Sequence, residues 1–294
     1  ASRASPAATP AASPLRKAAA GGGTKAADSG GAAVVSFATS LNLDTLMQAE
    51  SSVGTFPVPD SGTQDKIHFL VNNVSVHNMA QKAAQLAQHL TAEYHQWFLQ
   101  YMVAKRSSIE PNFHALYLQL LDELKQDKLM RMIVKATVRN IQVLLQSEKI
   151  KTNSGERSLL KNLGSWLGQL TIARNRPVLQ RDIDPKALIL EAYEKGKMIA
   201  VIPFVGKMLE ACKASKVFRP PNPWLMALLG LLMEMYNEKD LKLNLKFEVE
   251  MLFKHLNIAK EDVPPSKLLH KYQRDRTSNS DWAVDKASLI PPAA

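Results

Sequence analysis

The chain has 294 residues, a formal net charge of +10 and 46% hydrophobic residues. Its single cysteine, Cys212, excludes an intrachain disulfide framework and a metal site closed by several thiolates, which fits a reducing compartment such as the cytosol or nucleus. The most apolar run, Trp224 to Met235, contains Glu234 and is too short to span a membrane, so we expect a soluble protein without a membrane partner.

Both ends of the chain have the composition of tails. The first 40 residues are mostly Ala, Ser, Gly and Pro, which cannot bury a core, so we predict a flexible linker over residues 1–60. Residues 277–294 are predicted to be a disordered tail, and removing residues 1–40 and 278–294 should leave the melting temperature unchanged. The absence of an initiator Met indicates a piece of a longer chain. The excess of positive charge lies in residues 61–276, where it favours an acidic partner or RNA.

From Asp65 onward, apolar residues recur at helical spacing and nowhere alternate as in a strand. A short helix at 40–46 precedes this region, and another at 267–274 follows it. Asp184-Pro185 and Asn222-Pro223 each have the pattern of a helix cap followed by the first helical residue. Between these ends we predict ten helices, over about residues 65–74, 78–90, 91–105, 111–124, 128–148, 155–174, 184–193, 203–213, 224–236 and 246–256.

Several helices carry features that bear on the packing. Gly164 and Gly168 form a GxxxG pattern, which favours close helix packing, whereas Gly196 and Pro203 are expected to interrupt the chain before the eighth helix. The fifth helix should bury one stripe, and the tenth should point three residues inward. The stripe is Met130, Val134, Val138, Ile141 and Leu145, and the inward residues are Phe247, Met251 and Leu252.

Ten helices with short connections pair naturally into five antiparallel hairpins. Each hairpin has an apolar stripe that it cannot cover alone, so stacking the hairpins is the economical arrangement. We therefore predict an all-α fold, a HEAT-like helical-repeat solenoid of about five antiparallel helix pairs. An irregular helical bundle remains the alternative, because the sequence has no strict repeat period.

The chain lacks the patterns that usually carry catalysis. None of the seven histidines forms HExxH or a spaced pair of ligands, and no Gly-rich phosphate loop is present. Cys212 has no adjacent histidine and is expected to be a packed thiol. We therefore predict no catalytic, metal or cofactor site, and a protein that is not an enzyme.

A basic ridge is predicted on the fifth helix, opposite its apolar stripe. It consists of Lys128, Arg131, Lys135 and Arg139, at spacings of three, four and four residues. Such a ridge is usually a solvated face, but it could also meet acidic protein or phosphate. No aromatic residues are interleaved with it, so recognition by base stacking is not expected.

One corner of the predicted fold has a distinctive sequence. Lys105-Arg106 ends a helix and Pro111 begins the next, in the run KRSSIEPNFHALY from Lys105 to Tyr117. An ordinary helix–helix turn would account for it. However, SxIEPNFxxxY resembles the same corner in the middle domain of eukaryotic initiation factor 4G. The longer run is more similar to the middle domain of the Not-one scaffold of the Ccr-Not deadenylase complex.

Three further runs resemble the Not-one middle domain, and they resemble initiation factor 4G much less. These are RSLLKNLGSWLG (157–168), FRPPNPW (218–224) and DLKLNLKFEVEML (240–252). The resemblance covers roughly residues 41–274. It implies a non-catalytic scaffold domain that holds a Caf-type poly(A) deadenylase on one surface and a DEAD-box translational repressor helicase on another.

The resemblance further implies a role in mRNA deadenylation, decay and translational repression. It also implies a location in cytoplasmic processing bodies and in the nucleus, with other Ccr-Not subunits bound by the rest of a longer chain. Two alternatives stay open. One is an initiation factor 4G-type domain that binds the translation-initiation helicase. The other is direct, weak RNA binding through the basic ridge.

Candidate docking residues follow from these assignments. At the helicase corner, Arg106 offers a planar fork for a carboxylate, and Phe113 is either an apolar anchor or a core residue. Arg106→Ala is therefore expected to be the cleaner test of helicase docking. The helicase-docking set is Lys105, Arg106, Glu110, Asn112, Phe113 and His114. The deadenylase-docking set, from turns beside Gly and Pro, is Met198, Ile199, Phe218 and Arg219.

Overall fold

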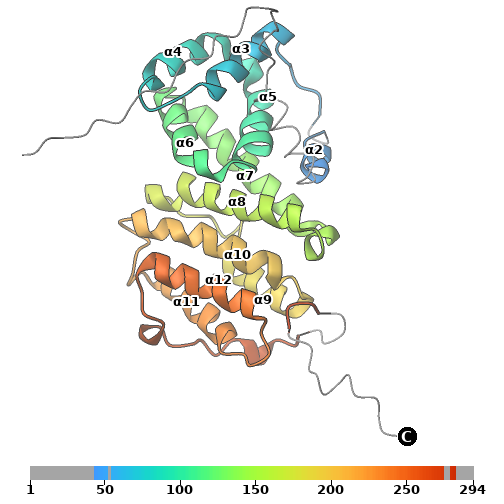
Figure 1. Cartoon of the computed structure of the whole chain (residues 1–294), viewed down its shortest axis with the longest axis vertical. Coiled ribbons are helices and arrows are strands. Elements are labelled where there is room, and N and C mark those ends of the chain that lie inside the picture. Colours follow the sequence, from blue (N-terminus) through green and yellow to red (C-terminus); the bar gives the residue numbers. More distant parts are fainter. Residues whose placement is uncertain (1–42, 52–53, 275–278, 283–294) are drawn as a thin grey trace, which may run out of the picture.

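The structure of the protein is a computed structural model that describes residues 43–51, 54–274 and 279–282 (Figure 1). Within these ranges the regular elements are helices, and the only β-type pairing is an isolated bridge between Leu241 and Trp282. The prediction of an all-α fold is confirmed. No helix among the described residues combines the length and the apolar character needed to cross a membrane.

The helices follow the predicted order with shifted ends. The α-helices are α2 (Asp44–Ser51), α3 (Ser61–Asn72), α4 (Met79–His89), α5 (His95–Leu99), α6 (His114–Glu123), α7 (Asp127–Gln146), α8 (Ser154–Leu170), α9 (Pro185–Lys195), α10 (Met198–Leu209), α11 (Pro223–Tyr236) and α12 (Leu243–Leu256). A π-helical segment, η2 (Gln100–Ser107), continues α5. The 3₁₀ turns are η1 (Ala92–Tyr94), η3 (Pro111–Phe113), η4 (Glu148–Lys151), η5 (Ile172–Arg174), η6 (Glu210–Ala214), η7 (Lys260–Asp262) and η8 (Leu269–Lys271).

Local sequence explains where two of these helices begin. The Asp184 side chain accepts a hydrogen bond from the Ala187 amide at 3.1 Å, and Pro185 follows it as the first residue of α9. Asn222 accepts from the amides of Trp224 and Leu225 at 3.0 and 3.2 Å, at the start of α11. Each cap satisfies amides that have no partner inside the helix. Both predicted cap-then-proline starts are confirmed.

The helices form five antiparallel pairs that stack along the chain. Four pairs are α3 with α4, α7 with α8, α9 with α10, and α11 with α12. The remaining pair is α5 and η2 with α6, joined by the Arg106–Tyr117 and His114–Ser107 hydrogen bonds. The second helices of successive pairs pack side by side in the order α4, α6, α8, α10, α12, as Figure 1 shows for the last three. The predicted helical-repeat solenoid is confirmed.

Helices α8 and α10 pack backbone against backbone at two glycines. A Cβ atom added at Gly164 would lie 2.6 Å from the Phe204 carbonyl oxygen, and one added at Gly168 would lie 2.5 Å from that of Met208. The two glycines therefore allow backbone-to-backbone packing, as their spacing predicted. Since Gly164 faces Phe204 and Gly168 faces Met208, the two helices run parallel.

This contact gives a first prediction. Gly164→Ala should lower the free energy of unfolding by about 2 kcal/mol, because the added methyl group meets backbone that can only move by separating the helices. Gly206→Ala in α10 is the matched control, since a Cβ there meets nothing within 4 Å. That variant should gain up to about 1 kcal/mol from helix propensity. Chemical denaturation of both variants tests the pair, and equal effects would contradict the close contact.

The eighth helix begins earlier than predicted. Helix α10 starts at Met198 and continues through Pro203 to Leu209. A proline inside a helix costs about 3 kcal/mol, but α10 is buried along most of its length, and that burial outweighs the cost. The last predicted helix, 267–274, is also wrong in extent, because only the 3₁₀ turn η8 forms there.

Residues 279–282 belong to the folded domain, which corrects the predicted tail at 277–294. The buried Asp281 carboxylate accepts hydrogen bonds from the amides of Met198 and Ile199, at 2.8 and 3.0 Å. Trp282 packs edge-on against Tyr193 at 5.8 Å, and the Arg274 guanidinium lies 3.9 Å from its ring centroid. The first turn of α10 is thus capped by a side chain from the far end of the chain.

The predicted linker at 1–60 is likewise wrong for α2. Leu46 is fully buried, and the Thr45 hydroxyl donates to Glu156 Oε1 at 2.6 Å. Ser147 donates to the other oxygen of Glu156 at 2.7 Å, so α2 is tied to the junction of α7 and α8. Residues 1–42 lie outside the described residues, and their predicted dispensability stays a prediction.

Candidate protein-docking surfaces

The predicted helicase corner contains an internal polar network. Arg106 Nη2 lies 3.1 Å from Glu110 Oε2 and donates to the Tyr117 hydroxyl at 2.8 Å. Tyr117 in turn donates to Glu110 Oε2. The Arg106 and Glu110 side chains are only 12% and 14% exposed. The guanidinium fork predicted to receive a partner's carboxylate is therefore already occupied by Glu110.

His114 lies beneath the corner. Its side chain is buried, its Nε2 lies 2.6 Å from the Ser107 carbonyl oxygen, and its ring packs against Trp166 at 5.1 Å. Burial lowers the pKa of His114, which favours the neutral ring that donates to the carbonyl. The prediction that His114 contacts a partner is wrong, because the side chain does not reach the surface.

Three of the predicted helicase-docking residues do reach the surface. Lys105 and Asn112 are exposed, and Phe113 is 49% exposed although its ring lies only 6.0 Å from that of Tyr117. Phe113 is therefore not a core residue. We refer to Lys105, Asn112 and Phe113 as the exposed corner. Asn162 of α8 donates to the Ser108 carbonyl at 2.8 Å and so joins this corner to the next helix pair.

The four predicted deadenylase-docking residues do not form one surface. Met198 is fully buried, so its prediction as a contact is wrong, while Ile199 is half-buried beside it. Phe218 is half-buried with its ring edge-on to Trp224 at 5.6 Å, and Arg219 is exposed. Met198 and Ile199 begin α10, whereas Phe218 and Arg219 lie beyond η6 in the connection to α11.

Helix α12 exposes an apolar row that includes two residues predicted to point inward. Leu243, Phe247 and Met251 are 65%, 52% and 59% exposed, and their spacing of four residues places them on one face of the helix. We call this row the α12 stripe. The core is contacted instead by Leu245, Val249, Leu252, Phe253 and Leu256. The predicted inward positions of Phe247 and Met251 are wrong, and that of Leu252 is confirmed.

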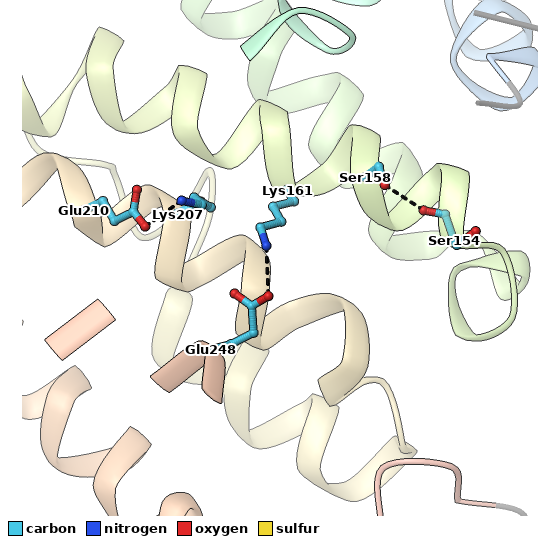
Figure 2. A network of polar contacts seen from close by, with 6 residues as sticks. All are labelled: Ser154, Ser158, Lys161, Lys207, Glu210 and Glu248. Atoms are coloured by element: carbon cyan, nitrogen blue, oxygen red, sulfur yellow. Dashed lines mark hydrogen bonds and ion pairs between the residues drawn. The ribbon is translucent and has the colours of Figure 1, made fainter. Parts of the chain in front are cut away.

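A polar network lies beside the α12 stripe. Figure 2 shows Lys161 of α8 pointing to Glu248 of α12, with Nζ and Oε1 at 2.8 Å. It also shows Lys207 paired with Glu210 at 2.7 Å along α10 and η6. These ion pairs are partly solvated and contribute little to stability. Glu248 directly follows Phe247 in α12, so its pair with Lys161 gives one side of the α12 stripe a polar border.

The basic ridge lies mostly on the surface of α7. Lys128, Arg131 and Lys135 are exposed, and Arg139 is half-buried. The last three of these line a groove that Val134 and Val138 also line, so the ridge and part of the predicted stripe share one side of α7. The core side of α7 is made by Leu129, Ile133, Ile141 and Leu144. The predicted stripe is confirmed in part: Val138 and Ile141 are buried in the core, and the other three residues are half-buried against it, namely Met130, Val134 and Leu145.

The described residues contain no group of three or more His, Cys, Asp or Glu side chains placed to hold a metal ion. Cys212 is buried in the core, and burial raises the pKa of its thiol to about 12. The thiol is therefore protonated at neutral pH, as expected of a packed cysteine.

Comparison with known proteins identifies the family. Residues 55–279 match the family model for the CCR4-NOT transcription complex subunit 1 CAF1-binding domain. CCR4-NOT transcription complex subunit let-711 of Caenorhabditis elegans is 43% identical over 226 residues, covering 74% of this chain and 9% of that protein. General negative regulator of transcription subunit 1 is 39% identical in Schizosaccharomyces pombe and 36% in Saccharomyces cerevisiae, over 71% and 70% of this chain.

The chain spans only 9% to 10% of the length of these curated relatives. The match nevertheless covers all five helix pairs and the docked residue 279. The predicted resemblance to the middle domain of the Not-one scaffold is confirmed: this chain belongs to the CAF1-binding domain family of CCR4-NOT transcription complex subunit 1.

Proposed function

We propose that this chain is a non-catalytic scaffold segment of a CCR4-NOT complex and that it docks a Caf-type poly(A) deadenylase through the α12 stripe. The name of the family supports a Caf-type deadenylase as the partner, and the exposed α12 stripe supports the proposed contact surface. The other large exposed hydrophobic side chains in the described ranges are dispersed over separate elements. They are Val58, Phe69, Val76, Phe113, Leu179 and Val217.

The α12 stripe has the composition of an interface centre. Three large apolar side chains stand in a row, and the paired charges of Lys161 and Glu248 border them on one side. Protein interfaces combine an apolar centre with a polar rim, and a few buried side chains supply most of the binding energy. Lys254, three residues after Met251, is exposed on the same face of α12, so a partner that covers the stripe should offer an acidic or polar acceptor beside its apolar contact.

Phe247→Asp tests the proposal. It should weaken binding of a purified Caf-type deadenylase by about 2 kcal/mol, the scale of an interface anchor, and so raise the Kd about 30-fold. Phe69→Asp on α3 is the matched control, since Phe69 is 59% exposed and lies outside the stripe. Isothermal titration calorimetry measures both. Wild-type affinity in Phe247→Asp, with a normal melting temperature, would reject the stripe as the contact.

A second proposed partner is a DEAD-box translational repressor helicase, docked at the exposed corner. A rigid surface can stimulate such an enzyme by contacting its two lobes preferentially in their closed arrangement. Lys105 and Asn112 offer donors there, and Phe113 offers an apolar anchor. Together the two partners would couple deadenylation to decay and translational repression, in cytoplasmic processing bodies and in the nucleus.

Phe113→Ala should weaken helicase binding about tenfold and reduce its stimulated ATP hydrolysis in parallel. Because Phe113 is half-exposed, the melting temperature should stay within about 2 °C of the wild type. Pull-down with the translational repressor helicase and the initiation helicase in competition separates this role from an initiation factor 4G-type role. Preferential capture of the initiation helicase would favour the latter.

A further inference from the structure

A groove runs along α7 on the side of the basic ridge. Its volume is about 510 Å³, and its opposite wall is the connection from the end of α8 to α9. We call it the basic groove. This volume is within the range of clefts that bind small ligands or single peptide segments.

Positive charge enters the groove from both walls. Arg131, Lys135 and Arg139 come from α7, and Arg176 and Arg181 come from the opposite connection. Asp182 is the single carboxylate among the lining residues. Its Oδ1 lies 3.9 Å from Arg181 Nε, and the two side chains are 41% and 82% exposed, so this contact is solvated and weak. The walls therefore favour an anionic ligand.

Arg139 carries the most specific signal. Its Nη1 atom is buried and has no hydrogen-bond partner within the described part of the chain. An unsatisfied N–H group of a cation is unfavourable in a buried position. Arg139 also lines the groove, so a small rotation of its side chain toward a bound carboxylate would give this group an acceptor, and charge-assisted bonds of this kind are stronger than neutral ones.

The uncharged residues of the groove restrict the chemical class of the anionic ligand. Val134, Val138, Leu170 and Pro177 are apolar, and Leu179 is 41% exposed on the same lining. No aromatic side chain lines the groove, so a nucleic acid would find phosphate contacts but nothing on which to stack its bases. A ligand that combines carboxylates with an aliphatic side chain matches both parts of the lining.

The spacing of the α7 cations fits an extended peptide. Arg131, Lys135 and Arg139 follow one another at four residues, which is about 6 Å along a helix. Side chains on one side of an extended strand are about 6.6 Å apart. We propose that the basic groove binds an extended acidic peptide segment of a partner protein, with Asp or Glu at alternate positions and an aliphatic residue between them.

The test uses fluorescence anisotropy with the full chain at about 150 mM salt, where exposed charges are largely screened beyond about 8 Å. The probe is a labelled peptide of alternating Glu and Leu. A second peptide has Gln in place of every Glu, and a third probe is oligo(A) RNA of similar charge. The groove should bind the Glu peptide at least about tenfold more tightly than either of the others.

The double variant Lys135→Glu, Arg139→Gln should weaken binding of the Glu peptide by at least about tenfold. The matched control Lys213→Glu, Lys216→Gln makes the same change in net charge at exposed lysines outside the groove, and its affinity should change less than about twofold. Thermal melts check that both variants are folded. If the groove variant fails to fold, Leu179→Ala, which should weaken binding about threefold, replaces it.

Three results would overturn the proposal. In the first, both double variants lose affinity equally, which would mean that net charge alone attracts the peptide. In the second, RNA binds more tightly than the Glu peptide and loses affinity in the groove variant, which would make the groove a phosphate-backbone site. In the third, no probe binds to the wild-type chain.

Discussion

A chain that ends after residue 276 should be less stable than the full chain by about 3 kcal/mol. Of this, about 1 to 2 kcal/mol comes from the lost cap, since the buried amides of Met198 and Ile199 lose the Asp281 carboxylate. The remainder comes from exposing the surfaces of Tyr193 and Arg274 that Trp282 covers. Denaturant unfolding followed by circular dichroism measures the difference.

Two controls separate these contributions. A chain that ends after Trp282 keeps every described contact of the segment 279–282 and should unfold like the full chain. Asp281→Ala should lose only the cap, about 1.5 kcal/mol. The loss is limited because the carboxylate is buried. Burial disfavours the charged form and raises the pKa of Asp281, while the hydrogen bonds from the two amides stabilise the charged form and lower that pKa. Equal stability of the chains ending at 276 and at 282 would show that the segment does not hold α10.

Arg106→Ala should lower the free energy of unfolding by about 3 kcal/mol, the cost of leaving one member of a buried ion pair without its partner. The Glu110 carboxylate would keep only the Tyr117 hydroxyl as a donor among the contacts of this network. The guanidinium also lies over the rings of Tyr101 and Tyr117, at 5.8 and 5.6 Å. Thermal and urea unfolding measure the loss.

The double variant Arg106→Ala, Glu110→Gln should be about 1 kcal/mol more stable than Arg106→Ala, because it removes the unpaired charge. Arg106→Ala was expected to be the cleaner test of helicase docking, but the loss of stability makes it unsuitable for that purpose. Lost binding in that variant would report unfolding of the corner, and the exposed Phe113 provides the cleaner test. A fully stable Arg106→Ala protein would contradict the internal network.

The predictions that succeeded depend on nearby residues. A cap such as Asn222 with Pro223 acts within three residues, and the spacing of Gly164 and Gly168 sets a close contact by itself. The five helix pairs follow from helix lengths and short connections. The family resemblance came from runs of consecutive residues. None of these inferences needed to know which distant segments meet.

The predictions that failed depend on such distant meetings. Helix α12 has two apolar rows, and periodicity cannot say which one a neighbouring pair will cover, so Phe247 was placed inside. Met198 is the first residue of the buried helix α10, and its amide is bonded by Asp281 from 83 residues away. The basic groove likewise depends on Arg176 and Arg181 lying opposite α7. The prediction that Arg106 is free to bind a partner's carboxylate could have been avoided from local spacing, because Glu110 lies four residues away and can pair with it.

Methyl NMR on methionine-labelled protein tests most directly whether a Caf-type deadenylase contacts the α12 stripe. Met251 is 59% exposed on the stripe, whereas Met198 is fully buried and provides an internal reference. Addition of the deadenylase should shift or broaden the Met251 methyl signal and leave that of Met198 unchanged. An unchanged Met251 signal in a sample where the deadenylase is demonstrably bound would contradict the account.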